Sequence, residues 1–345
     1  MDTVTIKDIA RICGVGVSTV SRAINNHPDI NPQTKGKIME TIEKYHYVPN
    51  NSARNLKRTD AKTVAVLVKG ISNPMFGAMI KTIEEILQKA KYSMVLQHVD
   101  EKQDEVEVAI QLEKEKRLRG VVFLGGYFTH TEAKLKQIPI PFVLSTIGVP
   151  GERRRHSYAT VSVDDVKESK RAVEYLIAHG HRNIAIVTST EDDESIGRLR
   201  LEGYYEALRS HGIPVDDSLV YYMQEELGTY TMDSGYAAAR KILASEKKIT
   251  AIYVISDLVA LGVCKAIFDA GKSVPEDYSV MGFDGLDFAK YYQPSITTLR
   301  QPTEEMARAT VQELLREIKH KGNPKSMIFQ GELVEGQSVK DINKR

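Results

Sequence analysis

The sequence predicts an α/β protein: an all-helical N-terminal domain, then two doubly wound parallel-sheet subdomains. Two short amphipathic segments separated by Gly14-Val15-Gly16 open the chain, and apolar strands alternate with amphipathic helices from Thr63 onward. Strands that are apolar throughout and lie between helices form a parallel sheet that is covered on both faces. The alternation restarts near Asp164, so we expect two subdomains with a cleft between them.

The opening segment has the pattern of a helix-turn-helix. Its first helix presents one apolar face, formed by Ile6, Ile9, Ala10 and Cys13. After the glycine-containing turn, a second helix carries small and hydroxyl side chains on its outer side, together with the long cation Arg22. In a helix-turn-helix the second helix enters the major groove of DNA. A third helix is predicted from Pro32 to Tyr45, with Asn31 as its N-cap.

A short polar segment follows the three helices. Residues 50–58 are long enough for two helical turns, but so short and polar that we expect them to order only against a partner. The predicted domains are a helix-turn-helix domain over 1–49, a hinge helix and linker over 50–62, an N-subdomain over 63–163 with 293–325, and a C-subdomain over 164–292 with 326–340.

The pattern after the linker predicts individual strands and helices. Strands are expected at 63–68, 94–99, 121–124, 142–144, 160–163, 184–187, 220–223, 251–255 and 279–282. Helices are expected at 75–91, 104–116, 167–179, 197–211, 232–245 and 258–270.

Charge and cysteine content limit the class of protein. The net charge of the chain is +1, but residues 1–62 hold ten Lys and Arg against six Asp and Glu, so the basic character is local. The two cysteines, Cys13 and Cys264, have no metal or disulfide spacing, and Cys13 is expected to be buried. The start has no signal-peptide pattern and no apolar run is long enough to span a membrane. We expect a cytoplasmic protein.

Polar residues at strand ends are the candidates for ligand binding, because ligands of open α/β sheets bind at the carboxyl ends of strands. A carboxylate there accepts sugar hydroxyls, Arg200 donates in a fork, and Tyr230 stacks on a sugar or base. The alternative for each aspartate is an N-cap, which we favour for Asp165 and leave open for Asp257. The predicted effector-binding residues are Asn73, Phe76, Arg200, Tyr230, Ser256, Asp257 and Asp284.

Catalytic and metal motifs are not found in the sequence. Residues 266–273 end like a phosphate-binding loop but lack its first glycine, and the histidines have no metal-ligand spacing. We therefore expect no enzyme, no cofactor and no metal. Two alternatives stay open: a cytoplasmic solute-binding or sensor module, which has no need of residues 1–58, and a sugar-modifying enzyme, which needs acid–base pairs that we do not find.

Several blocks resemble, in the same order, those of the lactose/galactose-repressor (LacI/GalR) family of transcription factors. The matching segments are TIKDIARICGVGVSTVSRAINN, PNNSARNLKR, RLRLEGYYEAL, SDLVALGVCKAI and GFDGLDFAKYYQPSITTLRQP. The resemblance implies a helix-turn-helix, a hinge helix and an effector domain similar to periplasmic sugar-binding proteins. It also implies a regulator, most often a repressor, that binds a palindromic double-stranded operator as a homodimer, is nucleoid-associated when bound to DNA, and is controlled by a small molecule, expected here to be a carbohydrate.

The resemblance also assigns residues. Val17, Ser18 and Arg22 match base-reading positions, and Leu56 matches a leucine that wedges into the minor groove. Arg200, Ser256, Asp257 and Asp284 match effector-contacting positions, and Tyr230 matches a stacking one. The predicted DNA-binding residues are Ile6, Val17, Ser18, Thr19, Ser21, Arg22, Asn25, Asn50, Ala53, Arg54, Leu56 and Lys57.

The chain departs from the family pattern at three places. Gly16 stands where a capping serine is usual, and an arginine that commonly comes two residues before Ser338 is missing. No leucine heptad follows Lys340, so the tail-mediated tetramer of one family branch is not expected.

Overall fold

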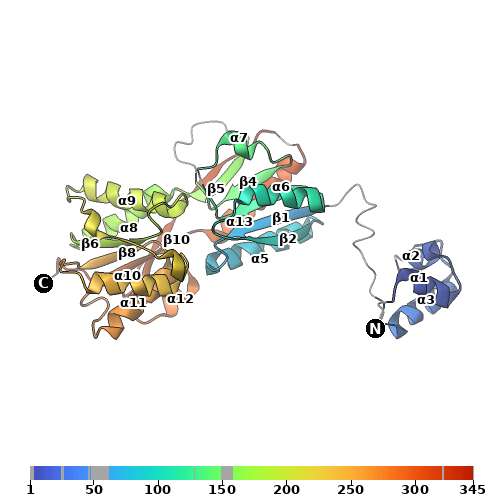
Figure 1. The fold of residues 1–345 in the computed structure, drawn as a ribbon, viewed down its shortest axis with the longest axis horizontal. Coiled ribbons are helices and arrows are strands. Elements are labelled where there is room, and N and C mark those ends of the chain that lie inside the picture. Colours follow the sequence, from blue (N-terminus) through green and yellow to red (C-terminus); the bar gives the residue numbers. More distant parts are fainter. Residues whose placement is uncertain are drawn as a thin grey trace. The chain divides into compact units, whose positions relative to one another are not determined.

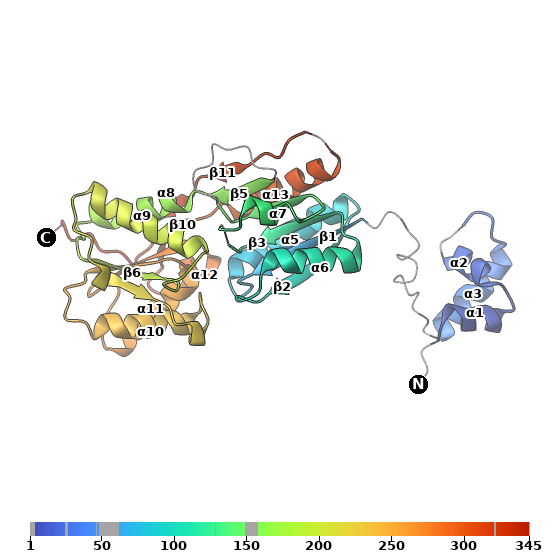
Figure 2. The ribbon, with the colours of Figure 1, turned by 45° about the horizontal axis from the view of Figure 1, so that its top comes forward.

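The computed structural model describes residues 4–24, 27–45, 47, 62–127, 129–148, 158–320 and 322–344. The chain divides into two compact units, Met1–Ala61 and Lys62–Arg345. Figures 1 and 2 show the first unit as helices and the second as two sheets with helices around them. The predicted fold class is confirmed.

Three helices form the first unit: α1 (Ile6–Cys13), α2 (Val17–Ile24) and α3 (Pro32–Lys44). Thr5 and Asp8 form a capping box at the start of α1, and Gly14 ends that helix with a left-handed φ of 68°. The core consists of Ile9, Ala10, Cys13, Val20, Ala23, Ile38 and Tyr47. Cys13 is buried as predicted, so a small shared core holds α2 against α1 and α3.

The second unit holds two six-stranded sheets. The first sheet has the order β11-β5-β4-β3-β1-β2 and all its pairs are parallel. Its strands are β1 (Thr63–Lys69), β2 (Ser93–Val99), β3 (Gly120–Leu124), β4 (Phe142–Ser145), β5 (Ala159–Val163) and β11 (Met327–Phe329). The second sheet has the order β12-β10-β9-β8-β6-β7, and β12 alone is antiparallel among the pairs described. Its strands are β6 (Ile184–Thr188), β7 (Val220–Tyr222), β8 (Ala251–Val254), β9 (Ser279–Asp284), β10 (Thr297–Arg300) and β12 (Glu332–Val334).

Helices cover both faces of the first sheet. Val64, Val66 and Val68 of β1 pack on one face with α5 (Pro74–Lys89) and α13 (Thr303–Ile318). Ala65 and Leu67 pack on the other face with α6 (Glu105–Lys116) and α7 (Glu132–Leu135). This alternation follows from the period of two along a strand, and it explains why the strand reads as apolar throughout.

Around the second sheet, α8 packs on α9 and α10 packs on α11. The helical segments of this subdomain are α8 (Asp165–Ala178), α9 (Ile196–Ser210), α10 (Met232–Leu243), α11 (Asp257–Asp269), α12 (Asp287–Tyr291), and the short 3₁₀ turns η1 (Asp217–Leu219) and η2 (Glu225–Leu227).

The C-terminal segment corrects the predicted subdomain boundaries in two places. We placed 293–325 with the first sheet, but β10 (297–300) pairs in parallel with β9 of the second sheet. We placed 326–340 with the second sheet, but β11 (327–329) pairs with β5 of the first. The chain therefore crosses between the sheets near residues 164, 301 and 330.

The predicted strands and helices between 63 and 282 are all present, with ends shifted by a few residues. The sequence analysis assigned no element to α7, α12, β10, α13, β11 or β12. In the part of the chain that the structure describes, no helix combines the length and apolar character needed to cross a membrane.

Candidate DNA-reading helix and effector cavity

Helix α2 presents the surface expected to read DNA. Its buried residues are Val20 and Ala23, which face the three-helix core. Val17 is 42% exposed and Ser18 and Arg22 are exposed, while Thr19 and Ser21 are half-buried. An exposed valine at the start of such a helix is suited to contact a thymine methyl group, and an arginine to contact guanine. Ile6, on α1, is half-buried.

Six of the predicted DNA-binding residues lie outside the described residues. They are Asn25, Asn50, Ala53, Arg54, Leu56 and Lys57. Their roles, including the minor-groove wedge assigned to Leu56, stay predictions.

A cavity of about 390 Å³ is lined by residues from both subdomains of the second unit. The first subdomain contributes residues from the ends of β1, β2 and β3 and the start of α5: Lys69, Gly70, Asn73, Phe76, Glu101, Lys102, Gly125, Gly126 and Tyr127. The second contributes residues after β6 and β7 and at the start of α9: Ser189, Thr190, Asp192, Asp193, Glu194, Ser195, Ile196, Glu225, Glu226, Thr229 and Tyr230. The cavity thus lies at the carboxyl ends of these strands, where α/β folds bind ligands.

The predicted effector-binding residues divide into two groups. Asn73, Phe76 and Tyr230 line the cavity. Arg200, Ser256, Asp257 and Asp284 do not line it; each is at most 2% exposed. Contact between this second group and an effector stays a prediction.

The guanidinium of Arg200 is hydrogen-bonded to buried protein groups, so it is not positioned to form a bidentate hydrogen bond with a ligand. Its Nε donates to Asp165 at 2.9 Å, and its Nη1 donates to the Ile255 carbonyl at 2.6 Å and to Asp284 at 3.5 Å. Its guanidinium also lies 3.7 Å from the centroid of the Phe283 ring. The charges of Asp165 and Asp284 raise the pKa of Arg200, although burial opposes them. Arg200 therefore organises the protein beside the cavity.

Neither Asp165 nor Asp257 is an N-cap residue. The structure thus corrects the N-cap interpretation that we favoured for Asp165, and it rejects the one left open for Asp257. The N-cap of α8 is Asp164, and Asp165 is buried against Arg200. The N-cap residue of α11 is Ser256, while Asp257 accepts from the Leu286 backbone N–H at 2.7 Å and the Thr298 hydroxyl at 2.6 Å. Burial raises the pKa of Asp165 to about 6, against the effect of Arg200. Burial, with the nearby charge of Asp284, raises the pKa of Asp257 to about 8.

Comparison with known proteins identifies the family. Residues 5–50 match the bacterial regulatory proteins of the lacI family, and residues 173–339 match a periplasmic binding protein-like domain. The chain is 42% identical over 339 residues to the HTH-type transcriptional regulator MalR of Clostridium butyricum, covering 98% of this chain and 99% of that protein. The chain belongs to the LacI family. It is a DNA-binding transcriptional regulator with a ligand-binding effector domain.

Solved structures show the same architecture. The transcriptional regulator CelR in complex with cellobiose superposes with a TM-score of 0.69 at 28% identity, covering 97% of this chain and 99% of that one. A LacI-family regulator from Enterococcus faecium with bound ribose also gives a TM-score of 0.69, at 26% identity, covering 81% of this chain and all of that one.

Direct contacts join the two subdomains of this LacI-family regulator around the cavity. Asn73 Nδ2 donates to Asp284 at 3.1 Å. Nearer the rim, the Thr229 hydroxyl donates to Glu101 at 2.7 Å and Lys102 forms an ion pair with Glu225 at 3.2 Å. These contacts link opposite walls of the cavity, and the hydrogen bond from Asn73 to Asp284 is less exposed to solvent than the Lys102–Glu225 ion pair.

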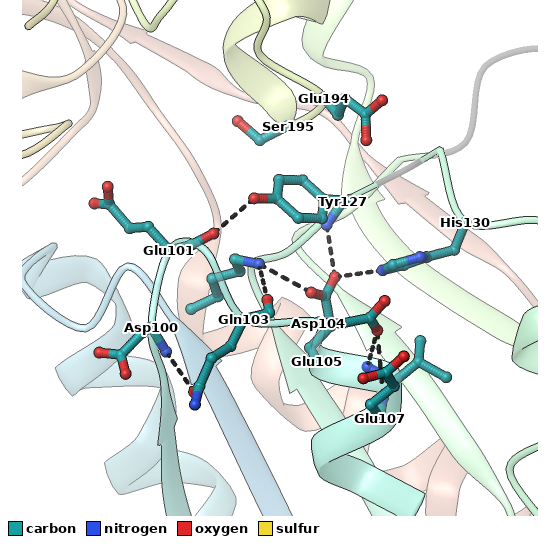
Figure 3. A network of polar contacts seen from close by, with 12 residues as sticks. Asp100, Glu101, Gln103, Asp104, Glu105, Glu107, Tyr127, His130, Glu194 and Ser195 are labelled. Carbon is teal, nitrogen blue, oxygen red and sulfur yellow. Dashed lines mark hydrogen bonds and ion pairs between the residues drawn. The ribbon is translucent and has the colours of Figure 1, made fainter. Parts of the chain in front are cut away.

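One wall of the cavity is built around the buried carboxylate of Glu105 (Figure 3). Glu105 accepts from the Tyr127 backbone N–H at 2.8 Å, contacts His130 Nε2 at 2.8 Å, and forms an ion pair with Lys69 at 3.1 Å. Although burial favours the neutral form, these partners together lower the pKa of Glu105 to about 2. Gly126 permits this approach, because a Cβ there would lie 2.5 Å from a Glu105 carboxylate oxygen. Glu105 thus fixes the loop that carries Tyr127.

Asp104, Glu105 and His130 come close enough for their ligand atoms to hold a metal ion, a grouping that spacing along the sequence did not reveal. Both carboxylates, however, already form ion pairs with lysines, Asp104 with Lys134 and Glu105 with Lys69. The ammonium groups of Lys69 and Lys134 therefore already balance the charge of the two carboxylates, and we assign no metal ion to this group of residues.

The sequence analysis missed most of the residues that line the cavity in this regulator. Glu101, Gly125 and Ser189 come within two residues of the ends of β2, β3 and β6. The strand-end rule that selected Asn73 would therefore have found them. The predicted aspartates, Asp257 and Asp284, and the predicted arginine, Arg200, are instead buried by the fold.

Proposed function

We propose that this protein is a transcriptional repressor that binds a palindromic operator as a homodimer and is controlled by a carbohydrate in the cavity between its subdomains. The observation that carries the proposal is a two-walled cavity on the same chain as a helix-turn-helix. We also propose that it acts in the cytoplasm, on the nucleoid, and catalyses no reaction.

The chemistry of the cavity supports a carbohydrate effector. Carboxylates such as Asp192 and Glu226 are acceptors for sugar hydroxyls, and Phe76, Tyr127 and Tyr230 offer aromatic surface to the apolar side of a sugar ring. The related regulators with cellobiose and ribose support the same class.

Dimerisation is proposed from the family and from the surface of the second unit. Tyr291, on α12, is 80% exposed, and Ile71 and Leu96 are exposed apolar residues of the same unit. We propose that these side chains lie in the interface between subunits, where aromatic and apolar residues are enriched. A dimer places two recognition helices on the two halves of a palindrome.

Control of DNA binding follows from linkage between effector and subdomain arrangement. An effector that contacts both walls favours one angle between the subdomains, and through the linker it changes how two recognition helices reach the DNA. A coupling free energy of about 1–3 kcal/mol is typical of allosteric proteins, and such a coupling changes operator affinity by roughly 5- to 150-fold.

The test selects DNA from a random library with the full-length protein and then measures binding by mobility shift. We expect a symmetric sequence to be selected and its affinity to change when a sugar is added. Selection of no symmetric sequence contradicts the operator proposal, and no response to any sugar contradicts the carbohydrate proposal.

Substitution of Arg22 tests the reading helix. We expect Arg22→Ala to reduce discrimination between the selected and a scrambled sequence by about 1–3 kcal/mol, because a base contact is lost. The control is Lys44→Ala, which removes an exposed cation of α3. It should change affinity for both sequences alike, and equal effects of the two substitutions would remove Arg22 from the base-reading set.

A further inference from the structure

The cavity has two cationic residues in its lining, Lys69 and Lys102, and both are engaged by the protein. Lys69 Nζ donates to the Gln103 carbonyl at 2.6 Å and to Glu105 at 3.1 Å, and the side chain is 8% exposed. Lys102 is paired with Glu225 across the rim. An anionic group entering the cavity therefore meets no lining cation without a carboxylate beside it.

Lys69 has a second contact, with the ring of Tyr127. Its Nζ lies 3.7 Å from the ring centroid, close enough for a cation–π interaction. The Tyr127 hydroxyl donates to the Glu101 carbonyl at 2.7 Å, and its backbone N–H is held by Glu105. Figure 3 shows the ring between the Glu105 carboxylate and residues Glu194 and Ser195 of the opposite subdomain. The ring is thus fixed before any ligand arrives.

We propose that Tyr127 is the fixed aromatic wall on which the effector's sugar ring packs. Glu105 positions the Tyr127 ring and forms an ion pair with the Lys69 ammonium. The cavity consequently binds uncharged carbohydrates and rejects phosphorylated or acidic ones. This inference rests on the proposed carbohydrate effector and adds its charge class and a specificity residue. A prearranged ring binds without loss of side-chain freedom.

The remaining charge of the cavity acts in the same direction. Six lining residues are acidic: Glu101, Asp192, Asp193, Glu194, Glu225 and Glu226. Asp193 is occupied by Ser189 and the backbone of Ser195, whereas Asp192 and Glu226 are exposed residues of the lining whose carboxylates are acceptors for hydroxyl groups. A phosphate or carboxylate would be repelled by these side chains, whereas an uncharged polyol gains hydrogen bonds.

The first test measures sugar binding by full-length protein. Cellobiose, maltose, ribose, glucose 6-phosphate and galacturonate are screened by thermal shift, and dissociation constants are measured by calorimetry for those that bind. We expect an uncharged sugar to bind and both anions to fail. Tyr127→Leu should weaken binding of the uncharged sugar about tenfold or more, while Tyr127→Phe, which keeps the ring but loses the hydrogen bond to the Glu101 carbonyl, should weaken it less. Melting without sugar reports whether each variant folds.

The second test separates positioning from mere structure. In Glu105→Gln the Lys69 ammonium loses its charged partner, so we expect this variant to bind the uncharged sugar more weakly and to gain binding of glucose 6-phosphate. The control is Glu107→Gln, an exposed glutamate on the same helix, which should change neither.

The outcomes distinguish this inference from the proposed function. Wild-type binding of an anionic sugar as tight as of any uncharged one overturns the charge class. Unchanged sugar affinity in Tyr127→Leu overturns the aromatic wall, and in both cases a carbohydrate effector stands. If no sugar binds the wild-type protein, the carbohydrate effector itself is wrong and this inference fails with it.

Discussion

At the scale of single residues, two buried carboxylates at the same position in their helices differ in charge because their pKa values are shifted in opposite directions. Asp257 and Glu105 each begin a helix, α11 and α6, a few residues after a strand. Glu105 meets Lys69, His130 and a backbone N–H, so its pKa is lowered to about 2. Asp257 is hydrogen-bonded by the Thr298 hydroxyl and backbone N–H groups, and burial together with the nearby charge of Asp284 raises its pKa to about 8. The neighbours across the fold, and not the helix position, determine the charge.

Asp257 makes stability depend on pH. The carboxyl group of an unfolded aspartate has a pKa of about 3.9, whereas Asp257 in the folded protein keeps its proton up to a pH of about 8. The folded state therefore binds more protons between these values, and the free energy of unfolding falls as pH rises through that window, by up to about 1.4 kcal/mol per unit. We expect the melting temperature of wild type, relative to Asp257→Asn, to fall from pH 5 to pH 8.

The comparison uses thermal melting of both proteins at each pH, so that other titrating groups cancel. Glu105→Gln provides the opposite case, because folding lowers the pKa of Glu105. The difference in melting temperature between wild type and Glu105→Gln should therefore shrink only as the pH falls below about 4.5. A constant difference between wild type and Asp257→Asn would show that Asp257 is ionised in the folded protein.

At the scale of elements, close packing of helices depends on glycines that the sequence pattern does not distinguish. Gly262 in α11 lies so near α10 that a Cβ would come 1.9 Å from the Met232 carbonyl oxygen. Gly77 in α5 is also helical, but a Cβ there would meet nothing within 4 Å. Glycine is thus required for close helix packing at position 262, whereas at position 77 the packing leaves room for a side chain.

These two glycines give a matched pair of substitutions. Gly262→Ala should lower the free energy of unfolding by about 1–3 kcal/mol or more, because the backbone of α10 must move. Gly77→Ala should raise it by about 0.5–1 kcal/mol, since alanine restricts the unfolded chain and fits the helix. Urea unfolding of both variants measures the difference, and equal effects of the two would contradict the close approach of α10 and α11.

At the scale of the whole molecule, Asp284 links the parts of the effector domain. It accepts from Asn73 of the first subdomain, from Gln301 at a crossing between the sheets, and from Ser256 and Arg200 of the second subdomain. Its φ of 113° is outside the range that most residues adopt, so the strand end is held by these partners. A change in the angle between subdomains must alter this set of contacts.

Asp284→Asn tests this link. An amide offers donors where the carboxylate accepts from four side chains, so we expect the ratio of operator affinities without and with effector to fall toward one. The measurement is operator binding by fluorescence anisotropy with the sugar identified by thermal shift. Asp287→Asn, at an exposed residue of α12, is the control. An unchanged ratio in Asp284→Asn would move the link between the subdomains elsewhere.

Much of the architecture could be predicted from the sequence because it depends on local periodicity. The glycine break after Cys13 and the apolar spacing of α1 and α2 indicated the helix-turn-helix, and runs such as Thr63–Val68 indicated buried parallel strands. Helix α13 has apolar residues at helical spacing as well, so its sequence also carries the signal that predicts a helix. Family blocks in the same order supplied the function, which the matched relatives bear out.

The placement of side chains depended on the tertiary structure. Three-residue strands such as β11 and β12 carry no periodicity that assigns them to a sheet, so their exchange between sheets was not predictable. Arg200 and Asp257 have the residue types of a binding site, yet the fold pairs and buries them, while Lys69 and Tyr127 form the wall of the cavity. Spacing along a chain determines which elements form, because those forces are local. Whether a polar group is free to contact a ligand depends on residues that are distant in the sequence, because these can form hydrogen bonds or ion pairs with it in the folded protein.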